Sequence, residues 1–510
     1  MTNSKYKYLN LIVCVILIIV CKYVLHPYLA TFKEDDIYCI TTDVWPDHGE
    51  YLTSFCSNFI VWWLPEMLHI HPQNFVDPFG VLVRCILLVG GCYLMASFVY
   101  MNNLKKTFMP FFIILSFYLT LVSFNYEYRA FYLYAGFFRF HFPLILSMAF
   151  WLLIYKNVIN EQKKVDKSTV FEVIISFLAG WSSEFISLFS MIPLGFLGLA
   201  KLIKEKRKFF DKNTILSIAF IIGGLLVIGQ SYFMQYANSY CTNPPIPLGT
   251  FLSEYWDLVI IRHLFPIYNI IILIFLLKMT NKLNSRILIP AVSFAISPYI
   301  VMGMFFFAGV YQWDFSHSWL YHGHFHQVMD NFLFCIQFFL FGNVLTGLET
   351  CDKKKSCLLM MIFIIVFQIL YSFNSFKVYC TDGINHHKYN DKMNTYITDK
   401  MFLFYILNDK PIVLGNKFVH NVVGVVDPNV YSEDIKETEV EHSRWFEYIR
   451  YIYPKVVDVS KYDKSKKIYF KPEDIAMEEF IKAGGNFEDG EIEKSDFNRL
   501  YDKDFVLNKK

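Results

Sequence analysis

Long runs of apolar residues recur from the start of the chain to about residue 374, and a charged segment without such runs follows. An apolar run of about 17–25 residues is long enough to cross a bilayer as a helix, and we expect about eleven such helices. They lie at residues 9–30, 79–101, 107–124, 138–155, 168–183, 185–201, 213–232, 264–279, 287–310, 327–347 and 357–374. The pattern predicts an α-helical polytopic membrane protein, with residues 1–374 as its transmembrane domain.

The runs 168–183 and 185–201 are short, and the sequence Gly180-Trp181-Ser182-Ser183-Glu184 lies between them. Basic residues indicate whether they form one helix or two, because cytoplasmic loops carry an excess of Lys and Arg. With a cytoplasmic N-terminus and two separate arms, every inner connection contains a basic cluster and no outer connection does. The inner clusters lie within residues 105–106, 156–167, 201–212, 278–286 and 353–355. We therefore expect two arms, with residues 180–184 at an outward hairpin tip.

The outer side would carry the first loop, residues 31–78, and the whole segment 375–510. The loop contains an amphipathic stretch at 51–70, which predicts a helix lying in the membrane interface. The segment 375–510 is far richer in charge than the rest of the chain. Strand-like runs at 411–414, 422–426, 456–459 and 467–470 alternate there with helical patterns at 398–407, 439–451 and 472–483. This alternation predicts a soluble α/β domain of about 130 residues.

Composition agrees with embedding in a lipid bilayer. Hydrophobic residues make up 55% of the chain and aromatic residues 19%, which is unusual for a soluble domain. The 11 Cys residues lie mostly inside apolar runs, where they act as small hydrophobic side chains. A disulfide among the outer Cys39, Cys56, Cys241 and Cys380 stays open. The net charge is +2 and the basic clusters lack interleaved aromatic residues, so we expect no nucleic-acid partner.

The acidic triplet Glu34-Asp35-Asp36 lies just past the first apolar run, at the predicted outer membrane edge. One interpretation is a solvated start of the loop. The other is a catalytic base or a metal site that meets a lipid head group. Neighbouring carboxylates repel each other, which raises the pKa of one of them. A carboxylate tuned in this way is suited to deprotonating a hydroxyl group.

Cations and hydroxyl groups gather at the predicted outer mouth of the bundle. Arg84 lies near the outer end of the second run, Tyr126 and Arg129 lie in the loop 125–137, and Arg139 and His141 follow it. Arg binds phosphate through its planar fork, so these residues are candidate ligands for a phosphate and a sugar. The alternative is an aromatic belt with arginines that extend to the interface.

Two further candidates are a carboxylate and a histidine cluster. Glu184 either lines a polar cavity or belongs to a plain turn. The cluster includes His322 and His324, but its spacing matches no zinc pattern. These histidines either bind phosphate and move protons or lie on the surface of an aromatic loop. We predict no cofactor, and participation of a divalent metal stays open.

A chain with many apolar spans and an acidic pair at the start of its first outer loop resembles the GT-C glycosyltransferase superfamily. More narrowly, the chain resembles the bacterial Gtr-type glucosyltransferases that modify O-antigen, the glycan of lipopolysaccharide, and thereby convert serotype. The residues that carry the resemblance are Glu34-Asp35-Asp36-Ile37-Tyr38, the Tyr- and Arg-rich second outer loop, and residues 180–184. The dense histidine stretch departs from the pattern of the family.

The resemblance implies that Asp35 or Asp36 activates the hydroxyl group of a glycan acceptor. The donor would be a sugar, glucose in these relatives, on polyprenyl phosphate. Arg84, Arg129 and Arg139, together with a histidine of the cluster, would neutralise the leaving phosphate. The resemblance also implies the bacterial inner membrane, with the C-terminal domain on the periplasmic side.

Other membrane functions remain as alternatives. An O-antigen polymerase or ligase would need an outer loop rich in arginine, and the outer connections contain few arginines. A transporter of lipid-linked glycans would show internal pseudo-symmetry and charges within the membrane. A membrane acyltransferase would place its histidine on the side of its donor.

Overall fold

The computed structural model describes the core of the chain and parts of its tail. The described residues are 2–29, 51–68, 79–101, 108–122, 137–159, 165–205, 211–238, 248–256, 264–307, 323–378, 401, 404–405, 408, 410–415, 468–471 and 473–485.

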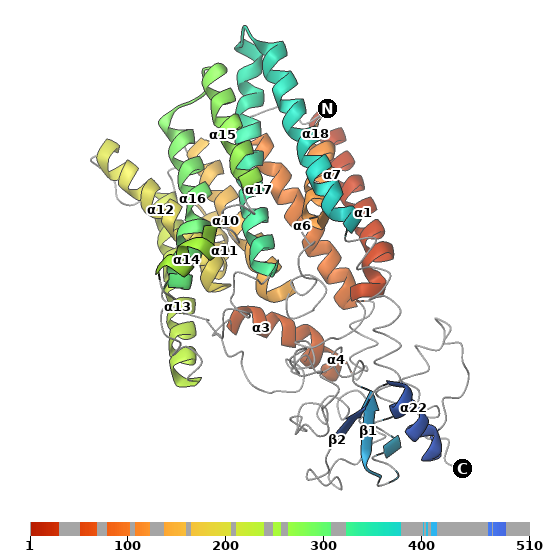
Figure 1. Ribbon diagram of the computed structural model, residues 1–510. Coiled ribbons are helices and arrows are strands. Elements are labelled where there is room, and N and C mark those ends of the chain that lie inside the picture. The colour runs from red at the N-terminus through yellow and green to blue at the C-terminus, as the bar shows by residue number, and fades with distance from the viewer. Residues whose placement is uncertain are drawn as a thin grey trace.

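Each of the predicted apolar runs forms a helix, and the helices lie side by side in one bundle (Figure 1). The helices are α1 (Thr2–Leu29), α6 (Val81–Tyr100), α7 (Met109–Val122), α10 (Phe142–Ile159), α11 (Ser168–Trp181), α12 (Glu184–Glu205), α13 (Lys212–Asn238), α15 (Leu264–Met279), α16 (Ser285–Phe307), α17 (Gly323–Gly347) and α18 (Lys354–Val378). A further short helix, α14, spans Leu248–Tyr255.

Several of these helices have the length and composition of membrane spans. Within the described residues, 5 are long and apolar enough to cross a bilayer, or 6 if the bent pair α11–α12 counts as one span. Shorter apolar helical segments lie at Tyr8–Tyr23, Met109–Leu121, Pro266–Met279 and Ile287–Val301. The chain is therefore an α-helical membrane protein, and the eleven crossings stay a prediction.

Burial separates the central helix from the peripheral ones. The apolar window of α17 is 83% buried, whereas that of α18 is only 22% buried. On α18, Leu359 and Phe363 are exposed, as expected for side chains that face lipid.

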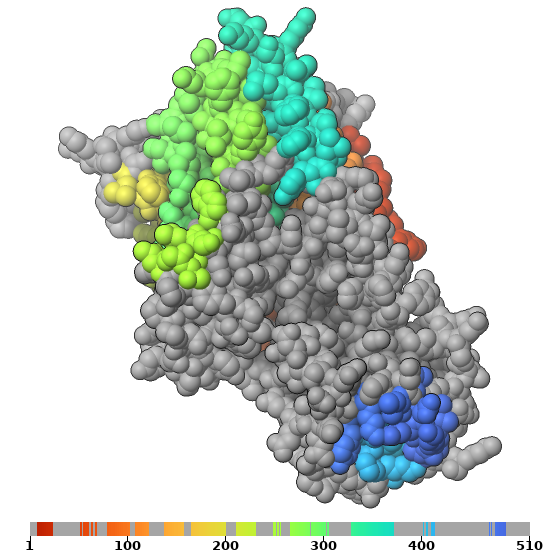
Figure 2. Space-filling view, in the orientation of Figure 1, coloured from red at the N-terminus to blue at the C-terminus, as the bar shows by residue number. Residues whose placement is uncertain are grey.

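The bundle has two distinct ends. The N-terminus and the connection between α17 and α18 lie at one end, which we call the amino end (Figure 1). Helix α3 (Tyr51–Asn58), the π-helix η1 (Phe59–Trp63) and α4 (Leu64–Met67) lie across the other end, which we call the α3 end. Figure 2 shows the cyan side chains of α17 and α18 at the amino end and the blue ones of α22 (Glu473–Lys482) at the opposite side of the molecule.

The predicted amphipathic helix is confirmed by the segment from α3 to α4. On one face, Phe55, Phe59 and Trp63 are exposed and their rings pack together, with Phe55 5.3 Å from Trp63 and 6.2 Å from Phe59. On the other face, Thr53 and Ser57 are buried. A helix with this arrangement presents its aromatic face away from the bundle.

In the tail, strand β1 (Ile412–Gly415) pairs in parallel with β2 (Ile468–Lys471), with Ile412 opposite Ile468. Helix α22 packs against β1, and the ring of Phe480 on this helix contacts that of Phe404 edge to face, with the ring centres 4.9 Å apart. The predicted strands at 411–414 and 467–470 and the helix at 472–483 are confirmed. The patterns at 422–426, 439–451 and 456–459 lie outside the described residues, and only scattered residues of 398–407 are described. Cys56 is a free thiol, whereas Cys39, Cys241 and Cys380 lie outside the described residues.

Helices α11 and α13 approach each other so closely that only glycine fits between their backbones. A Cβ atom on Gly180 would lie 2.0 Å from the carbonyl oxygen of Phe220, and one on Gly223 would lie 2.3 Å from that of Phe177. Small residues allow such close crossings in membranes, where helix association depends on van der Waals contact. This contact fixes the end of α11, and therefore the position of the break that follows it.

Candidate functional site

The structure describes only some of the residues that the sequence proposed as a site. Arg84, Arg139, His141 and Glu184 are described with their side chains. The backbone of His324 lies in the first turn of α17. Glu34, Asp35, Asp36, Tyr126, Arg129 and His322 lie outside the described residues.

Arg84 lies in the first turn of α6, near the α3 end of the bundle, and is only 1% exposed. Its Nε donates a hydrogen bond to the carbonyl oxygen of Gly80 at 3.4 Å. A cation in a membrane helix faces either the lipid interface or the protein interior. Arg84 therefore faces the interior. A charge buried there is costly and in membrane proteins usually marks a functional site.

A π-helical turn, η5 (Phe137–His141), positions His141 at the start of α10. His141 is buried, and its ring lies 4.9 Å from that of Phe137. Its Nε2 faces α6 at Gly91, where an added Cβ atom would lie 3.9 Å away. Gly91 follows Arg84 by two helical turns, so both residues lie on one face of α6 about 10 Å apart along its axis. Single-turn π-helices are frequent at functional sites, and no pattern in the sequence predicted this one.

Arg139 belongs to the same π-helical turn but is half-buried. Its guanidinium group lies over the ring of Phe140, 5.4 Å from the ring centre. This cation–π contact is the geometry expected of an arginine that passes along aromatic side chains at the rim of the bundle.

Glu184 begins α12 at a sharp bend, where the axes of α11 and α12 differ by 118°. The predicted break in the helix is confirmed. Ser182, Ser183 and Glu184 at this break are all buried, and the position of the tip on the outer side of the membrane stays a prediction. The close crossing of α11 and α13 holds the bend inside the protein. Ser182 Oγ and Ser187 Oγ then donate hydrogen bonds to carbonyl oxygens of the last turn of α11, at 2.8 Å and 2.6 Å.

His141 and Glu184 belong to neighbouring elements of the bundle. Helices α10 and α12 both begin at the α3 end, and Ser147 on α10 contacts Ser190 on α12 with their Oγ atoms 2.9 Å apart. Each of these serines comes six residues after its candidate residue, which corresponds to about 9 Å along each helix. The imidazole and the carboxylate therefore lie before the contact between Ser147 and Ser190, on two neighbouring elements.

Sequence reasoning missed two buried polar groups at the same end. Asn331 on α17 is 1% exposed, and Thr53 on α3 is equally buried. The π-helix η5 packs against both α3 and α17, so it links these groups to His141. The position of Asn331 as a polar residue inside an apolar run could have indicated a buried polar group. The i, i+4 spacing of Thr53 and Ser57 could have indicated a polar face on α3. We call Arg84, His141, Glu184, Asn331 and Thr53 the polar layer.

Three more polar side chains cross-link the bundle away from the polar layer. Asn269 on α15 donates to Gln368 on α18 at 2.6 Å and to Gln337 on α17 at 3.4 Å. They are amides within apolar helices, where such bonds hold neighbouring helices together.

The polar layer brings a cation, an imidazole, a carboxylate and neutral hydrogen-bonding groups to one end of an apolar bundle. This set can bind an anion and orient hydroxyl groups. Within the described part of the chain, no group of three or more His, Cys, Asp or Glu side chains is placed to hold a metal ion. No protein-family profile, no curated protein and no solved structure matches this chain.

Proposed function

We propose that the protein is a membrane glycosyltransferase of the GT-C type. It transfers a sugar from a polyprenyl-phosphate donor to a surface glycan such as O-antigen. The sugar is glucose in the Gtr-type enzymes that the sequence resembles. In this proposal the α3 end is the outer face of the bacterial inner membrane, and the amino end is cytoplasmic. The basic residues of the α17–α18 connection at the amino end support this orientation.

The observation that carries the proposal is the burial of Arg84 at the α3 end, the same end of the bundle as His141 and Glu184. A donor with its phosphate at the membrane edge and its hydrocarbon chain in the bilayer needs a cation at this place. Arg is suited to it because its planar fork binds two phosphate oxygens at once.

In the proposed reaction, a hydroxyl oxygen of the acceptor attacks the anomeric carbon of the donor sugar. Asp35 or Asp36 accepts the hydroxyl proton. The bond between the anomeric carbon and the phosphate oxygen breaks, with inversion, and polyprenyl phosphate leaves with the electron pair. Arg84 stabilises the charge that develops on the phosphate, together with Arg129 and Arg139.

The remaining candidates act in binding the sugars. Glu184 and Glu34 accept hydrogen bonds from sugar hydroxyl groups, and Tyr126 stacks on a sugar face. His141, His322 and His324 contact the phosphate or the sugar from the same end. Residues 375–510 form a soluble outer α/β domain that contacts the glycan acceptor. Pairing of β1 with β2 and packing of α22 against β1 support this domain.

A lipid-linked glycan transporter is the second candidate, because broken helices inside a bundle are typical of transporters. The break between α11 and α12 has this form. In transporters, however, the free helix N-terminus attracts an anionic group of the substrate. Here Glu184 occupies the first turn of α12, and its carboxylate would oppose a phosphate at that position.

Replacement of the acidic pair tests the proposal. We expect Asp35→Asn or Asp36→Asn to reduce transfer by about 10²-fold or more, because the base for the attacking hydroxyl is lost. The measurement is release of polyprenyl phosphate from a panel of polyprenyl-phosphate sugars by the purified full-length protein, alongside modification of the surface glycan in cells. Asp47→Asn, in the same loop, is the matched control and should leave transfer unchanged.

Each other outcome has a distinct meaning. Normal transfer by both single variants and the double variant would overturn the assignment of the base. Altered chain length of the glycan without loss of a side-branch sugar would favour a polymerase. Movement of the labelled donor across vesicle membranes, without transfer of its sugar, would favour a transporter.

A further inference from the structure

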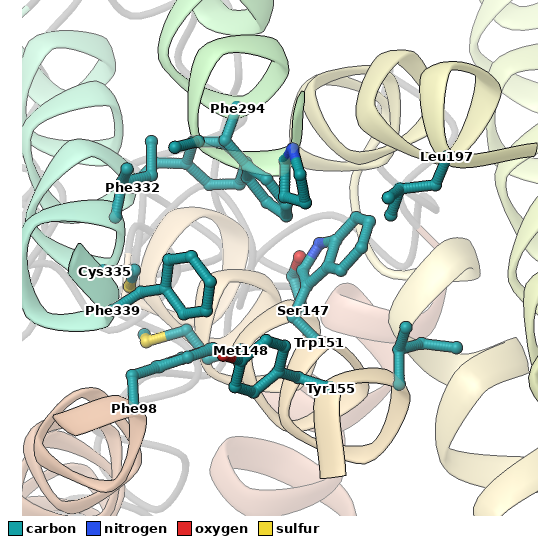
Figure 3. Close-up of a pocket in the computed structure, with 14 residues that line it drawn as sticks. Phe98, Ser147, Met148, Trp151, Tyr155, Leu197, Phe294, Phe332, Cys335 and Phe339 are labelled. Atoms are coloured by element: carbon teal, nitrogen blue, oxygen red, sulfur yellow. The ribbon is translucent and has the colours of Figure 1, made fainter. Parts of the chain in front are cut away.

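A cavity lies inside the bundle, between α6, α10, α12, α16 and α17 (Figure 3). Its volume is about 100 Å³. The long wall comes from α10, where the lining residues run from Ser147 to Tyr155, which corresponds to about 12 Å along the helix. His141 of the polar layer, just before α10 begins, precedes this wall, toward the α3 end.

The lining of the cavity is almost entirely apolar and strongly aromatic. Trp151 on α10, Phe294 on α16, and Phe332 and Phe339 on α17 point toward the hollow in Figure 3. Their rings support each other, with Trp151 4.3 Å from Phe294 and Phe294 5.3 Å from Phe332. A rigid apolar wall of this kind fits a hydrocarbon and offers nothing to a charged ligand.

The polar atoms at the rim are already satisfied by the protein itself. Trp151 Nε1 donates a hydrogen bond to Ser190 Oγ at 3.1 Å, and Ser147 Oγ lies 2.9 Å from the same oxygen. Water would therefore gain few partners in this space. Apolar cavities of roughly 150 Å³ stay dry and take up small hydrocarbons.

Helix α12 offers the most exposed side chains next to the cavity. Leu197 lines it and is half-buried, whereas Phe196 and Leu199 beside it are 49% and 57% exposed. On the opposite side, Phe332 and Ile336 of α17 are buried and close the hollow. A chain lying in the bilayer along α12 can thus enter from the side.

From this geometry we infer that the cavity binds one hydrocarbon chain of a membrane lipid. The inference rests on the membrane embedding and the cavity alone, and it holds whether or not the protein transfers sugars. The chain belongs either to a bilayer phospholipid or to a polyprenyl phosphate, and both offer the same apolar surface to the aromatic wall.

The test uses the full-length protein in phosphatidylethanolamine nanodiscs. The probe is phosphatidylethanolamine with a photoactivatable diazirine in one acyl chain, and the labelled peptides are mapped after irradiation. We expect adducts on the segments that contain Trp151, Phe294 and Phe339. Leu197→Trp fills the hollow and should reduce these adducts about tenfold, since the chain loses its apolar contacts. Leu199→Trp, two residues along on the exposed face, is the matched control and should leave them unchanged.

A second filling variant and a second lipid complete the experiment. Ala291→Phe closes the cavity from α16 and should act like Leu197→Trp, while adducts on the exposed Leu359 and Phe363 stay constant in every folded variant. Undecaprenyl phosphate that displaces the probe at a far smaller mole fraction than unlabelled phospholipid identifies an isoprenoid chain, and equal displacement identifies a bilayer acyl chain. Adducts confined to Leu359, Phe363 and other outward residues, or cavity adducts that persist in both filling variants, overturn the inference.

Discussion

Charge is buried at both ends of this bundle, but the two clusters are built differently. At the amino end, Lys212 of α13 is 1% exposed and pairs with Glu172 at 2.9 Å and Asp166 at 3.4 Å. Asp166 also accepts hydrogen bonds from the hydroxyl groups of Ser168 and Thr169. These partners all lie at the start of α11, so the cluster caps one helix and ties it to the next.

The polar layer at the α3 end has another organisation. Arg84, His141 and Glu184 stand on three elements that are separated in the sequence, and only the assembled bundle brings them to the same end. Capping of the helix is a sufficient explanation for a charge cluster at the start of one helix. Buried polar groups that several helices collect at one end of the bundle need a further reason, and the proposed binding of the donor offers one.

The largest expected effect separates these two roles directly. Arg84→Gln retains a hydrogen-bonding side chain but removes the positive charge, so we expect sugar transfer to fall by about 10²-fold. Lys212→Gln, at the amino end, should leave transfer per folded molecule unchanged and lower the thermal midpoint by several degrees, since Glu172 and Asp166 lose their counterion. The measurements are the polyprenyl-phosphate release assay and thermal unfolding in detergent.

The opposite result for Arg84→Gln would remove the distinction between Arg84 and Lys212. If Arg84→Gln lost stability and retained its transfer rate per folded molecule, Arg84 would be structural like Lys212. Arg84→Lys restores the charge without the fork, and a partial recovery of transfer would show that a cation is needed at that position.

The contact that holds the α11–α12 bend in place provides a second test. A Cβ atom on Gly223 would lie 2.3 Å from the carbonyl oxygen of Phe177 and 2.8 Å from the backbone nitrogen of Trp181. Backbone cannot move aside as a flexible side chain can, so Gly223→Ala should destabilise the protein by about 1–3 kcal/mol. Thermal or denaturant unfolding in detergent measures this change.

Gly229 on the same helix is the matched control. Nothing lies within 4 Å of a Cβ atom there, so Gly229→Ala should stabilise the helix by about 0.5–1 kcal/mol. The two identical substitutions on α13 should therefore have opposite signs. Equal effects at both positions would show that the crossing of α11 and α13 is looser than the structure indicates.

The sequence predicted the elements well because the signals for them are local. Apolar runs of bilayer length became helices, and Gly180 followed by Ser182, Ser183 and Glu184 marked the break between two of them. The burial of that break was not predicted. It depends on how closely α11 crosses α13, and the periodicity of one helix contains no information about its distance from another.

The same limit applies to the polar layer. Arg84, His141 and Glu184 could be named from the sequence as unusual residues near apolar runs, but their shared place at the α3 end depends on how α10 packs against α6 and α12. Asn331 was overlooked because a single polar residue hardly changes the mean hydropathy of the apolar run around it. The roles of Asp35 and Asp36 stay predictions, since both lie outside the described residues.

The smallest expected effect concerns pH and belongs to the amino-end cluster. Hydrogen bonds from Ser168 and then Thr169, with a contribution from Lys212, lower the pKa of Asp166 from 3.8 to about 2. A carboxylate whose pKa is lower in the folded state stabilises that state above its ordinary pKa, and this contribution disappears as the pH falls toward the lowered value. The stabilisation by Asp166 should thus be complete above pH ~5 and be lost between about pH 4 and pH 2.

Thermal unfolding of the wild-type protein and Asp166→Asn across this range measures the contribution. The wild-type protein should have the higher midpoint at pH ~6, and the difference should shrink steadily as the pH is lowered to about 2. Ser168→Ala removes the strongest of the hydrogen bonds and should move the loss to higher pH. If the difference between wild type and Asp166→Asn stays constant with pH, Asp166 acts through its shape as a cap and not through its charge. The amino-end cluster would then no longer be an example of a charge stabilised by local partners.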